Sequence, residues 1–306
     1  MLLHVVHETS YEYAPAVKTA QHMAHLKPAD NGGQRLLRFD LAISPKPVQQ
    51  SEAVDVYGNT RAFFSLQSSH EALTITATSL VSTSASVEPK SEMSWEEVRE
   101  RLRYHRGAAY DPASEFVFGS PQAPRHAEFL AYARPSFTPG RPLLEAARDL
   151  MHRIHADFKY ETEVTDVSTP PLDALKLRKG VCQDFAHVML ACMRSLGLPA
   201  RYVSGYLLTE PPPGQARLVG ADASHAWVSV YLPGDGEPGL WTDLDPTNDR
   251  APGEDYVTVA TGRDYVDVSP LRGVLHGGAR HELRVAVTVA PVEAGWREVT
   301  EVAGIA

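Results

Sequence analysis

Apolar residues recur at spacings of three and four along residues 183–197, the pattern of a helix with one buried stripe. The members of this stripe are Phe185, Val188, Met189, Cys192 and Leu196. Gly180 precedes the pattern, and Gly197 followed by Pro199 is a typical helix stop. Cys182 therefore lies at or just before the first helical turn. Unpaired N–H groups and the positive end of the helix dipole stabilise a thiolate there, so the pattern predicts a nucleophile.

The first part of the chain has a different pattern. Residues 1–85 are rich in β-branched and aromatic residues, with turn residues about every 10–15 positions, which predicts an antiparallel, sandwich-like domain. Residues 54–64 are expected to form a hairpin that turns at Gly58-Asn59. His22 and His25 could be metal ligands, but no third ligand is evident nearby, so solvated or capping histidines are the favoured interpretation.

Helical signals begin near residue 94. Ser94 and Glu97 form the pattern of a capping box, followed by a charged helix to residue 105. Residues 107–142 are rich in proline and glycine and are expected to form a long surface connection. Pro142 suits a first helical turn, and the apolar stripe that follows predicts a helix to about residue 154. A short helix is expected over residues 172–178.

Strands are expected after the cysteine helix, over residues 201–208, 225–232 and 240–246. The last two flank a turn-rich loop and should form an antiparallel hairpin. If Leu232 pairs with Leu240, Asp245 is the diagonal neighbour of His225, within side-chain reach, and Asp243 lies roughly 7 Å further along the strand. A shift of one pair brings Asp245 directly opposite His225, so both registers favour Asp245 as its partner. A further strand over residues 281–289 could belong to either domain.

Length, charge and cysteine content narrow the class of protein. A chain of 306 residues predicts about two domains. The net charge of −9 and the lack of a Lys/Arg block argue against nucleic acid or an anionic membrane as partner. The N-terminal residues do not resemble a signal peptide, and no apolar run approaches the roughly 18 residues of a membrane span. Cys182 and Cys192 lie about 15 Å apart along one helix, too far for a disulfide, which favours the cytoplasm.

Four ordered motifs carry a family resemblance. They read Gly180-Val-Cys-Gln-Asp-Phe-Ala-His, Gly197-Leu-Pro-Ala-Arg-Tyr-Val-Ser-Gly-Tyr, His225-Ala-Trp-Val-Ser-Val-Tyr and Leu244-Asp-Pro-Thr-Asn. In this order they resemble the core of bacterial transglutaminase-like proteins. The segments around residues 7–13, 55–59 and 262–270 also resemble the two-part bacterial members of that family.

The resemblance implies an α+β fold: an N-terminal antiparallel β domain, then a papain-like core with a cysteine-bearing helix packed on an antiparallel sheet. The expected organisation is a β-rich domain over residues 1–90, a helix and long connection over 91–141, the catalytic core over 142–250, and a C-terminal strand segment over 251–306 whose domain is left open. The resemblance also implies Cys182 as nucleophile, His225 as general base and acid, and Asp245 as the carboxylate that orients the imidazole.

Neighbouring residues are given lesser roles. Cys192 is expected in the core. Asp184 and His187 are expected to cap or support the site, since a carboxylate so close would oppose a thiolate. Trp227 either shields the imidazole or fills the core. Tyr160 is the candidate for a second oxyanion donor, beside the backbone N–H of the nucleophile, because aromatic or amide residues upstream of the cysteine have that role in similar proteins.

These features predict an enzyme that acts on an amide or peptide bond through a thioester, with a protein or peptide as substrate and no cofactor. Hydrolysis is favoured, because no feature of the sequence marks a lysine-binding or Ca²⁺-binding site. Transamidation uses the same three residues and stays open. So do two further alternatives: a catalytically silent binding scaffold, and a zinc site built from Cys182, His225 and Asp245.

Overall fold

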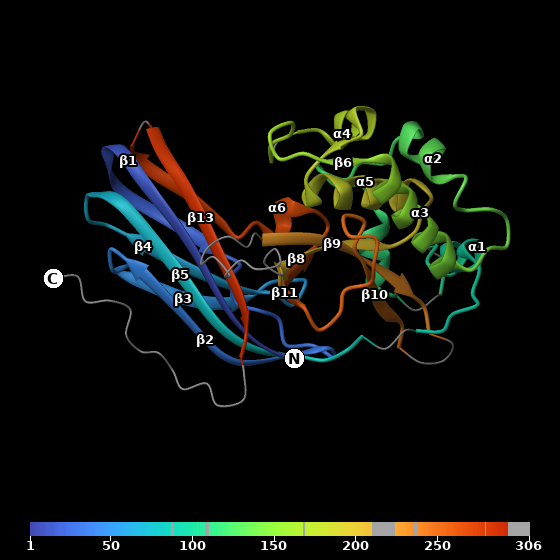
Figure 1. Cartoon of the computed structure of the whole chain (residues 1–306), viewed down its shortest axis with the longest axis horizontal. Helices are drawn as coiled ribbons and strands as arrows, with labels where there is room; N and C mark the ends of the chain where they lie inside the picture. Colours follow the sequence, from blue (N-terminus) through green and yellow to red (C-terminus); the bar gives the residue numbers. More distant parts are fainter. Residues whose placement is uncertain are drawn as a thin grey trace, which may run out of the picture.

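The computed structural model describes residues 1–86, 89–103, 105–107, 110–167, 169–209, 224–234, 238–278 and 280–292. Figure 1 shows two lobes: a lobe of long strands that contains both ends of the described chain, and a lobe in which helices cover a smaller sheet. The α+β class and the order of an N-terminal antiparallel sheet before a helix-on-sheet core are confirmed.

The first lobe is a seven-stranded antiparallel sheet. Its strands are β1 (Leu2–Ala24), β2 (Gln34–Ser44), β3 (Gln49–Val54), β4 (Thr60–Leu66), β5 (His70–Thr83), β12 (Leu271–Gly277) and β13 (Arg280–Pro291). The order is β2-β5-β1-β4-β3, and β12 and β13 both pair with β1. Strands β12 and β13 therefore complete the N-terminal sheet, so the strand expected over residues 281–289 lies in this lobe.

Strand β1 joins the two halves of this lobe. Its first half, residues 2–14, lies between β5 and β13, and its second half, residues 19–24, lies between β4 and β12. Alternate residues at the start of β1 are buried, as a strand with one covered face requires. The lobe is thus one continuous curled sheet rather than the two separate sheets of a sandwich.

The hairpin turn at residues 55–59 forms as expected and also connects the two lobes. Asp55 N–H donates to the Asn59 carbonyl at 2.9 Å, which closes the turn between β3 and β4. The Asn59 amide then exchanges two hydrogen bonds with the backbone of Thr261, at 2.8 and 2.7 Å. Gln34 does the same with Thr258, at 2.8 and 2.7 Å. These two side-chain amides pair with backbone N–H and C=O groups on the open edge of strand β11 in the second lobe, and so connect β11 to the first lobe.

The second lobe contains the candidate site. Its elements are α1 (Trp95–Arg101), a 3₁₀ helix (Pro112–Val117), α2 (Ala127–Ala133), α3 (Leu143–Asp157), β6 (Lys159–Tyr160), α4 (Pro171–Leu177), β7 (Lys179–Gly180), α5 (Cys182–Ser195), β8 (Ala200–Leu207), β9 (Ser224–Leu232), β10 (Leu240–Leu244), β11 (Tyr256–Gly262) and α6 (Tyr265–Val268). Four strands form an antiparallel sheet in the order β10-β9-β8-β11. Because β11 belongs to this sheet, the core extends past residue 250, where the sequence placed its end.

Helix α5 is the centre of this lobe. It contacts β8 and β9 on one side and α2, α3 and α4 on the others, as Figure 1 shows. Every residue from 184 to 194 is buried, including His187 and Arg194. The prediction of a helix with a single buried stripe is therefore wrong, because α5 is enclosed on all sides. Arg194 is accommodated at 0% exposure by hydrogen bonds to the carbonyls of Phe116 and Ala200 and to the Ser120 hydroxyl.

Part of the predicted surface connection is core structure. Residues 127–133 form α2, whose Phe129 and Ala133 are fully buried next to α5. Proline and glycine in the flanking turns concealed this short helix. The capping box before α1 is confirmed, since Ser94 N–H donates to the Glu97 carboxylate at 2.8 Å and Glu97 N–H donates back to the Ser94 hydroxyl at 3.3 Å.

The two candidate histidine ligands of the first lobe are both buried, and Nε2 of His25 lies 3.7 Å from Oδ2 of Asp55. His22 is 4% exposed and stacks on Phe64 at a centroid distance of 5.0 Å, and His25 is 2% exposed and bonds to the Ser269 carbonyl at 3.1 Å. Of the two alternatives, solvated or capping, the solvated one is wrong: His22 lies on the covered face of β1, and His25, one residue beyond β1, is buried and bonds to a backbone carbonyl. In the described part of the chain no group of three or more His, Cys, Asp or Glu residues could hold a metal ion. Among the same residues no helix is long and apolar enough to cross a bilayer.

Candidate active site

Cys182 is the first residue of α5 and retains 9% exposure, so it is more enclosed than a residue on an open cleft wall. The first N–H groups of a helix have no partner within it, which makes this end of α5 a set of donors. Asp184 caps one of them: its carboxylate accepts from Val181 N–H at 2.8 Å and from the Thr165 hydroxyl at 2.7 Å. Burial raises the pKa of Asp184, while these two hydrogen bonds lower it, and the net shift is upward.

Gly180 makes this cap possible. Its φ is +152°, and a Cβ atom built on it would lie 2.3 Å from Oδ2 of Asp184. A larger residue would displace the capping carboxylate and with it the start of α5. The strand pair β6–β7 holds the same segment from the other side, with Tyr160 opposite Gly180 and Glu161 N–H donating to the Gly180 carbonyl at 2.9 Å.

His225 and Asp245 meet at the end of the hairpin. The distance from Nε2 of His225 to Oδ2 of Asp245 is 2.7 Å. The Cys182 side chain also lies close enough to His225 to raise the pKa of the imidazole. Since Nε2 faces Asp245, Nδ1 is the ring nitrogen left for the thiol. The structure therefore brings Cys182, His225 and Asp245 together in one chain of contacts.

The hairpin register explains why the partner is Asp245 rather than Asp243. Leu240 pairs with Leu232, as the sequence predicted, and the ladder continues to Leu244 opposite Val228. Asp243 then lies one step further from His225, where it accepts a hydrogen bond from Nε1 of Trp227 at 3.1 Å. The geometry agrees with Asp245 as the partner of His225, and the catalytic role of Asp245 stays a prediction.

Asp245 is fully buried and accepts five hydrogen bonds. Oδ2 accepts from His225, from the Tyr256 hydroxyl at 2.7 Å and from the Asn248 side-chain amide at 2.7 Å. Oδ1 accepts from the backbone N–H groups of Thr247 at 2.8 Å and Asn248 at 3.3 Å. A carboxylate with this many donors is fixed in orientation and stays ionised despite its burial.

Opposing effects set the charge on this pair. Burial lowers the pKa of His225, but the hydrogen bonds to Asp245 and Cys182 and the charges on both outweigh it, and the pKa rises to about 10. Burial raises the pKa of Asp245, but the hydrogen bond and charge of His225 and the amide and hydroxyl donors bring it below its ordinary value. The geometry therefore favours an imidazolium beside a carboxylate at neutral pH.

Tyr160 is 53% exposed and next to Gly180 in the β6–β7 pair. Burial raises the pKa of its hydroxyl, and the nearby charges of Cys182 and Asp184 raise it further, which places the phenol in the surroundings of the thiol. The position suits an oxyanion donor that could turn toward a bound substrate.

The remaining candidates lie around the site rather than in it. Trp227 is fully buried, with its ring 6.1 Å from that of His225, so it both fills the core and covers the imidazole. Cys192 is fully buried, as predicted. His187 is 1% exposed and accepts from Tyr265 N–H at 3.2 Å. Burial lowers the pKa of His187 to about 3, so it is a neutral structural group.

Two residues of the site were missed from the sequence. Asn248 donates to Asp245 and also lies 3.3 Å from Nε2 of His225, and Tyr256 donates to the same carboxylate oxygen. Asn248 was part of a recognised motif, and its position three residues after Asp245 is the available signal. Tyr256 comes from β11, a separate strand, and nothing in the sequence connects it to the hairpin.

The contacts also decide against a zinc site. Nε2 of His225 and Oδ2 of Asp245 lie 2.7 Å apart, which is a hydrogen-bonding distance. Two ligand atoms that each lie about 2.0 Å from a zinc ion between them would be further apart than this. The imidazole and the carboxylate share a direct hydrogen bond instead.

Known proteins share both lobes of this arrangement. Residues 3–82 match the bacterial transglutaminase-like N-terminal region, and residues 130–246 match the transglutaminase-like superfamily. An uncharacterized protein of Mycobacterium tuberculosis is 40% identical over 297 residues, which cover 94% of this chain and 92% of that protein. The chain belongs to the bacterial transglutaminase-like family.

Further similarities extend to one enzyme and one solved structure. A protein-glutamine gamma-glutamyltransferase of Pseudomonas aeruginosa is 30% identical over 156 residues, which cover 48% of this chain but 22% of that enzyme. The crystal structure of a candidate cysteine protease from Cytophaga hutchinsonii superposes with a TM-score of 0.71 at 19% identity, over 97% of this chain and 92% of the other. At that identity the superposition supports the transglutaminase-like fold and no more.

Proposed function

We propose that this transglutaminase-like protein catalyses cysteine-dependent acyl transfer from an amide or peptide bond through a thioester. The observation that carries the proposal is the contact chain from Cys182 to His225 to the buried carboxylate of Asp245, with 2.7 Å between Nε2 and Oδ2. A nucleophile, a base and a group that orients the base are the minimum set for this chemistry.

In the proposed reaction, the Cys182 thiolate attacks the carbonyl carbon and forms a tetrahedral oxyanion. The N–H of Cys182 and the Tyr160 hydroxyl are the proposed donors to that oxygen. The His225 imidazolium then protonates the leaving amine, the C–N bond breaks and a thioester remains. An acceptor loses its proton to His225 and attacks the thioester, which releases the acyl product and regenerates the thiolate. Asp245 holds the imidazole in the required tautomer throughout.

The proposed acceptor is water, and the proposed substrate is a protein or peptide. Hydrolysis is preferred because the sequence carries no feature that marks a site for a lysine side chain or for Ca²⁺. The named activity of the P. aeruginosa relative keeps protein-glutamine transamidation as the alternative. A catalytically silent scaffold is the third candidate. Retention of all three reactive residue types and of the five donors to Asp245 weighs against it.

Trapping the acyl-enzyme tests the reaction class. The wild type and Cys182→Ser, mixed with a short peptide ester, should differ in intact mass by one acyl group, present on the wild type alone. Adding a primary amine then separates the acceptors: hydrolysis predicts free acid as the main product, and transamidation predicts the amine adduct. No acyl adduct with any of a panel of peptide esters, in a protein whose fold is verified, would support the scaffold.

We also propose a reducing compartment, the cytoplasm, as the site of action. Both cysteines lie on α5, at its first turn and ten residues further along, so neither can pair with the other. Fractionation of the source cells with an antibody against the protein would decide this, and recovery outside the cytoplasm would contradict it.

A further inference from the structure

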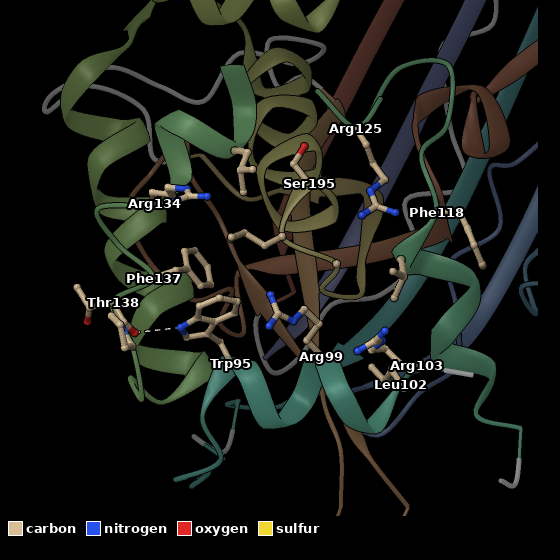
Figure 2. Close-up of a pocket in the computed structure, with 15 residues that line it drawn as sticks. Trp95, Arg99, Leu102, Arg103, Phe118, Arg125, Arg134, Phe137, Thr138 and Ser195 are labelled. Atoms are coloured by element: carbon tan, nitrogen blue, oxygen red, sulfur yellow. Dashed lines mark hydrogen bonds between the residues drawn. The ribbon is translucent and has the colours of Figure 1, made fainter. Parts of the chain in front are cut away.

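A second hollow lies at the opposite end of α5 from Cys182. Its volume is about 880 Å³, and its walls come from α1, the loop before α2, the end of α2 and the segment 195–197 that ends α5 (Figure 2). Since α5 has 14 residues, about 20 Å of helix separates this hollow from the thiol. A molecule bound here would not touch the proposed catalytic residues.

Among the residues that the structure describes, four arginines and no acidic residue line this hollow, which we name the arginine pocket: Arg99, Arg103, Arg125 and Arg134. The whole chain has the opposite charge balance, with 38 acidic and 29 basic residues. The positive charge of this pocket therefore differs from the average charge of the protein. Figure 2 shows the four side chains around the hollow, with the guanidinium groups of Arg99 and Arg125 directed into it.

Three of these arginines form no ion pair with a carboxylate among the residues that the structure describes, although the Glu100 carboxylate also acts electrostatically on Arg99. Only Arg103 forms an ion pair there, with Glu100 at 2.9 Å. Arg99 lies over the ring of Trp95 at 4.8 Å, and Arg125 and Arg134 have no ion pair in that part of the chain. Like charges gathered around one hollow repel each other, and an anionic ligand would remove that repulsion.

The floor of the arginine pocket is apolar and held in place. Trp95 donates to the Thr138 carbonyl at 2.9 Å and meets the 5% exposed Phe137 edge to face at 6.0 Å. Leu130 and Leu196 complete this surface. A volume of about 880 Å³ is within the range of roughly 300–1,000 Å³ that is typical of sites for small organic molecules.

We propose that the arginine pocket binds a small phosphorylated organic molecule. Planar guanidinium groups pair with phosphate through two parallel hydrogen bonds, and one phosphate or diphosphate concentrates two or more charges within reach of several arginines. A single carboxylate would leave most of the positive charge unpaired. The aromatic and leucine floor takes the organic part of the ligand, which distinguishes this pocket from a site for inorganic phosphate alone.

The test is calorimetric titration of the full-length protein at low salt with pyrophosphate, adenosine diphosphate and adenosine as probes. Adenosine diphosphate should bind more tightly than pyrophosphate, because it also covers the apolar floor, and adenosine alone should not bind measurably. Replacing Arg125 and Arg134 together by alanine should weaken binding of the diphosphate at least about tenfold, since each removes a charge-assisted contact. The matched control, Arg35→Ala with Arg280→Ala on exposed strands of the first lobe, should leave the affinity unchanged.

Other results would overturn the proposal. They are no binding of either phosphate probe at millimolar concentration, equal weakening in the control variant, or tighter binding of a glutamate-rich peptide than of adenosine diphosphate. If the double variant does not fold, Arg125→Gln alone should still weaken binding, and unchanged affinity would count against the site. Cys182→Ala should bind the diphosphate like the wild type, so the arginine pocket and the proposed reaction can fail separately.

Discussion

Replacing Asp245 by asparagine tests the electrostatic part of the site. The asparagine side chain has the shape of the aspartate side chain but no charge. One of its two terminal groups is an N–H₂ donor in place of an oxygen acceptor. Because both carboxylate oxygens accept hydrogen bonds, at least one group of donors then faces an N–H₂ group. The part of the support for the raised His225 pKa that comes from Asp245 is lost, while the burial that lowers this pKa and the Cys182 interaction that raises it both remain.

The expected loss of activity depends on pH. If the pKa of His225 returns to its ordinary 6.5, the imidazolium fraction falls about fourfold at pH 7 and about 300-fold at pH 9 relative to the wild type. In the variant, burial still lowers this pKa and Cys182 still raises it, so these factors are orders of magnitude. Loss of the fixed imidazole orientation lowers kcat further at every pH. We therefore expect the Asp245→Asn to wild-type ratio of kcat/KM to decline steadily above neutral pH.

The assay is a pH series of kcat/KM for an amide or ester substrate, with folding verified at each pH. Asp243→Asn is the matched control, because Asp243 carries the same charge two residues away but bonds to Trp227 instead of His225. It should retain near wild-type activity and the wild-type pH profile. A profile for Asp245→Asn that runs parallel to the wild type would refute the electrostatic reasoning. A larger loss in Asp243→Asn would refute the choice of carboxylate.

Three further substitutions have separate outcomes. Cys182→Ala should abolish turnover yet change the free energy of unfolding by about 1 kcal/mol or less, since a small, marginally exposed side chain is lost, and a large fall in Tm would show a structural residue. Gly180→Ala should lower the free energy of unfolding by about 2 kcal/mol or more, because the new Cβ would lie 2.3 Å from Oδ2 of the capping Asp184 carboxylate. Denaturant unfolding measures this change, and an unchanged free energy of unfolding would contradict the prediction. Tyr256→Phe should cost about 1.5–3 kcal/mol by removing a donor to the buried Asp245, and should lower kcat more than it raises KM.

The pH dependence of stability gives an independent readout of the same pair. A histidine whose folded pKa is raised stabilises the folded protein below its unfolded pKa of about 6.5, and this contribution is lost as pH rises toward 10. In chemical denaturation, the difference in free energy of unfolding between the wild type and Asp245→Asn should therefore decrease as the pH rises from about 6.5 to 10. A constant difference across that range would indicate an unperturbed imidazole.

Local patterns were sufficient to predict the hairpin and the start of α5. The expected antiparallel hairpin forms with Leu240 opposite Leu232, one of two registers that the sequence left open. Both registers, like the family resemblance, favoured Asp245 as the partner of His225. Glycine and proline marked the limits of α5 because they act on the backbone at one position. Features that depend on residues close together in the sequence could thus be predicted from the sequence alone.

Features that depend on distant segments were not. The pairing of β13 with the first half of β1 joins residues nearly 280 positions apart, and no local pattern in residues 281–289 distinguishes that partner from another strand. Helix α5 carries His187 and Arg194 on faces that a sequence pattern would expose, and only the surrounding helices and their hydrogen bonds allow their burial. Tyr256 and the arginine pocket follow from the same kind of long-range packing.

The central claim is that Cys182 is the reactive nucleophile of the proposed site with His225 and Asp245. The most direct test is the intact mass of the folded protein after treatment with iodoacetamide at about pH 6. At this pH an ordinary thiol is less than about 1% ionised. We predict one label, located at Cys182, while Cys192 stays unlabelled because it is fully buried and burial raises its thiol pKa. Labelling of neither cysteine, or of both, in protein shown to be folded would contradict the assignment.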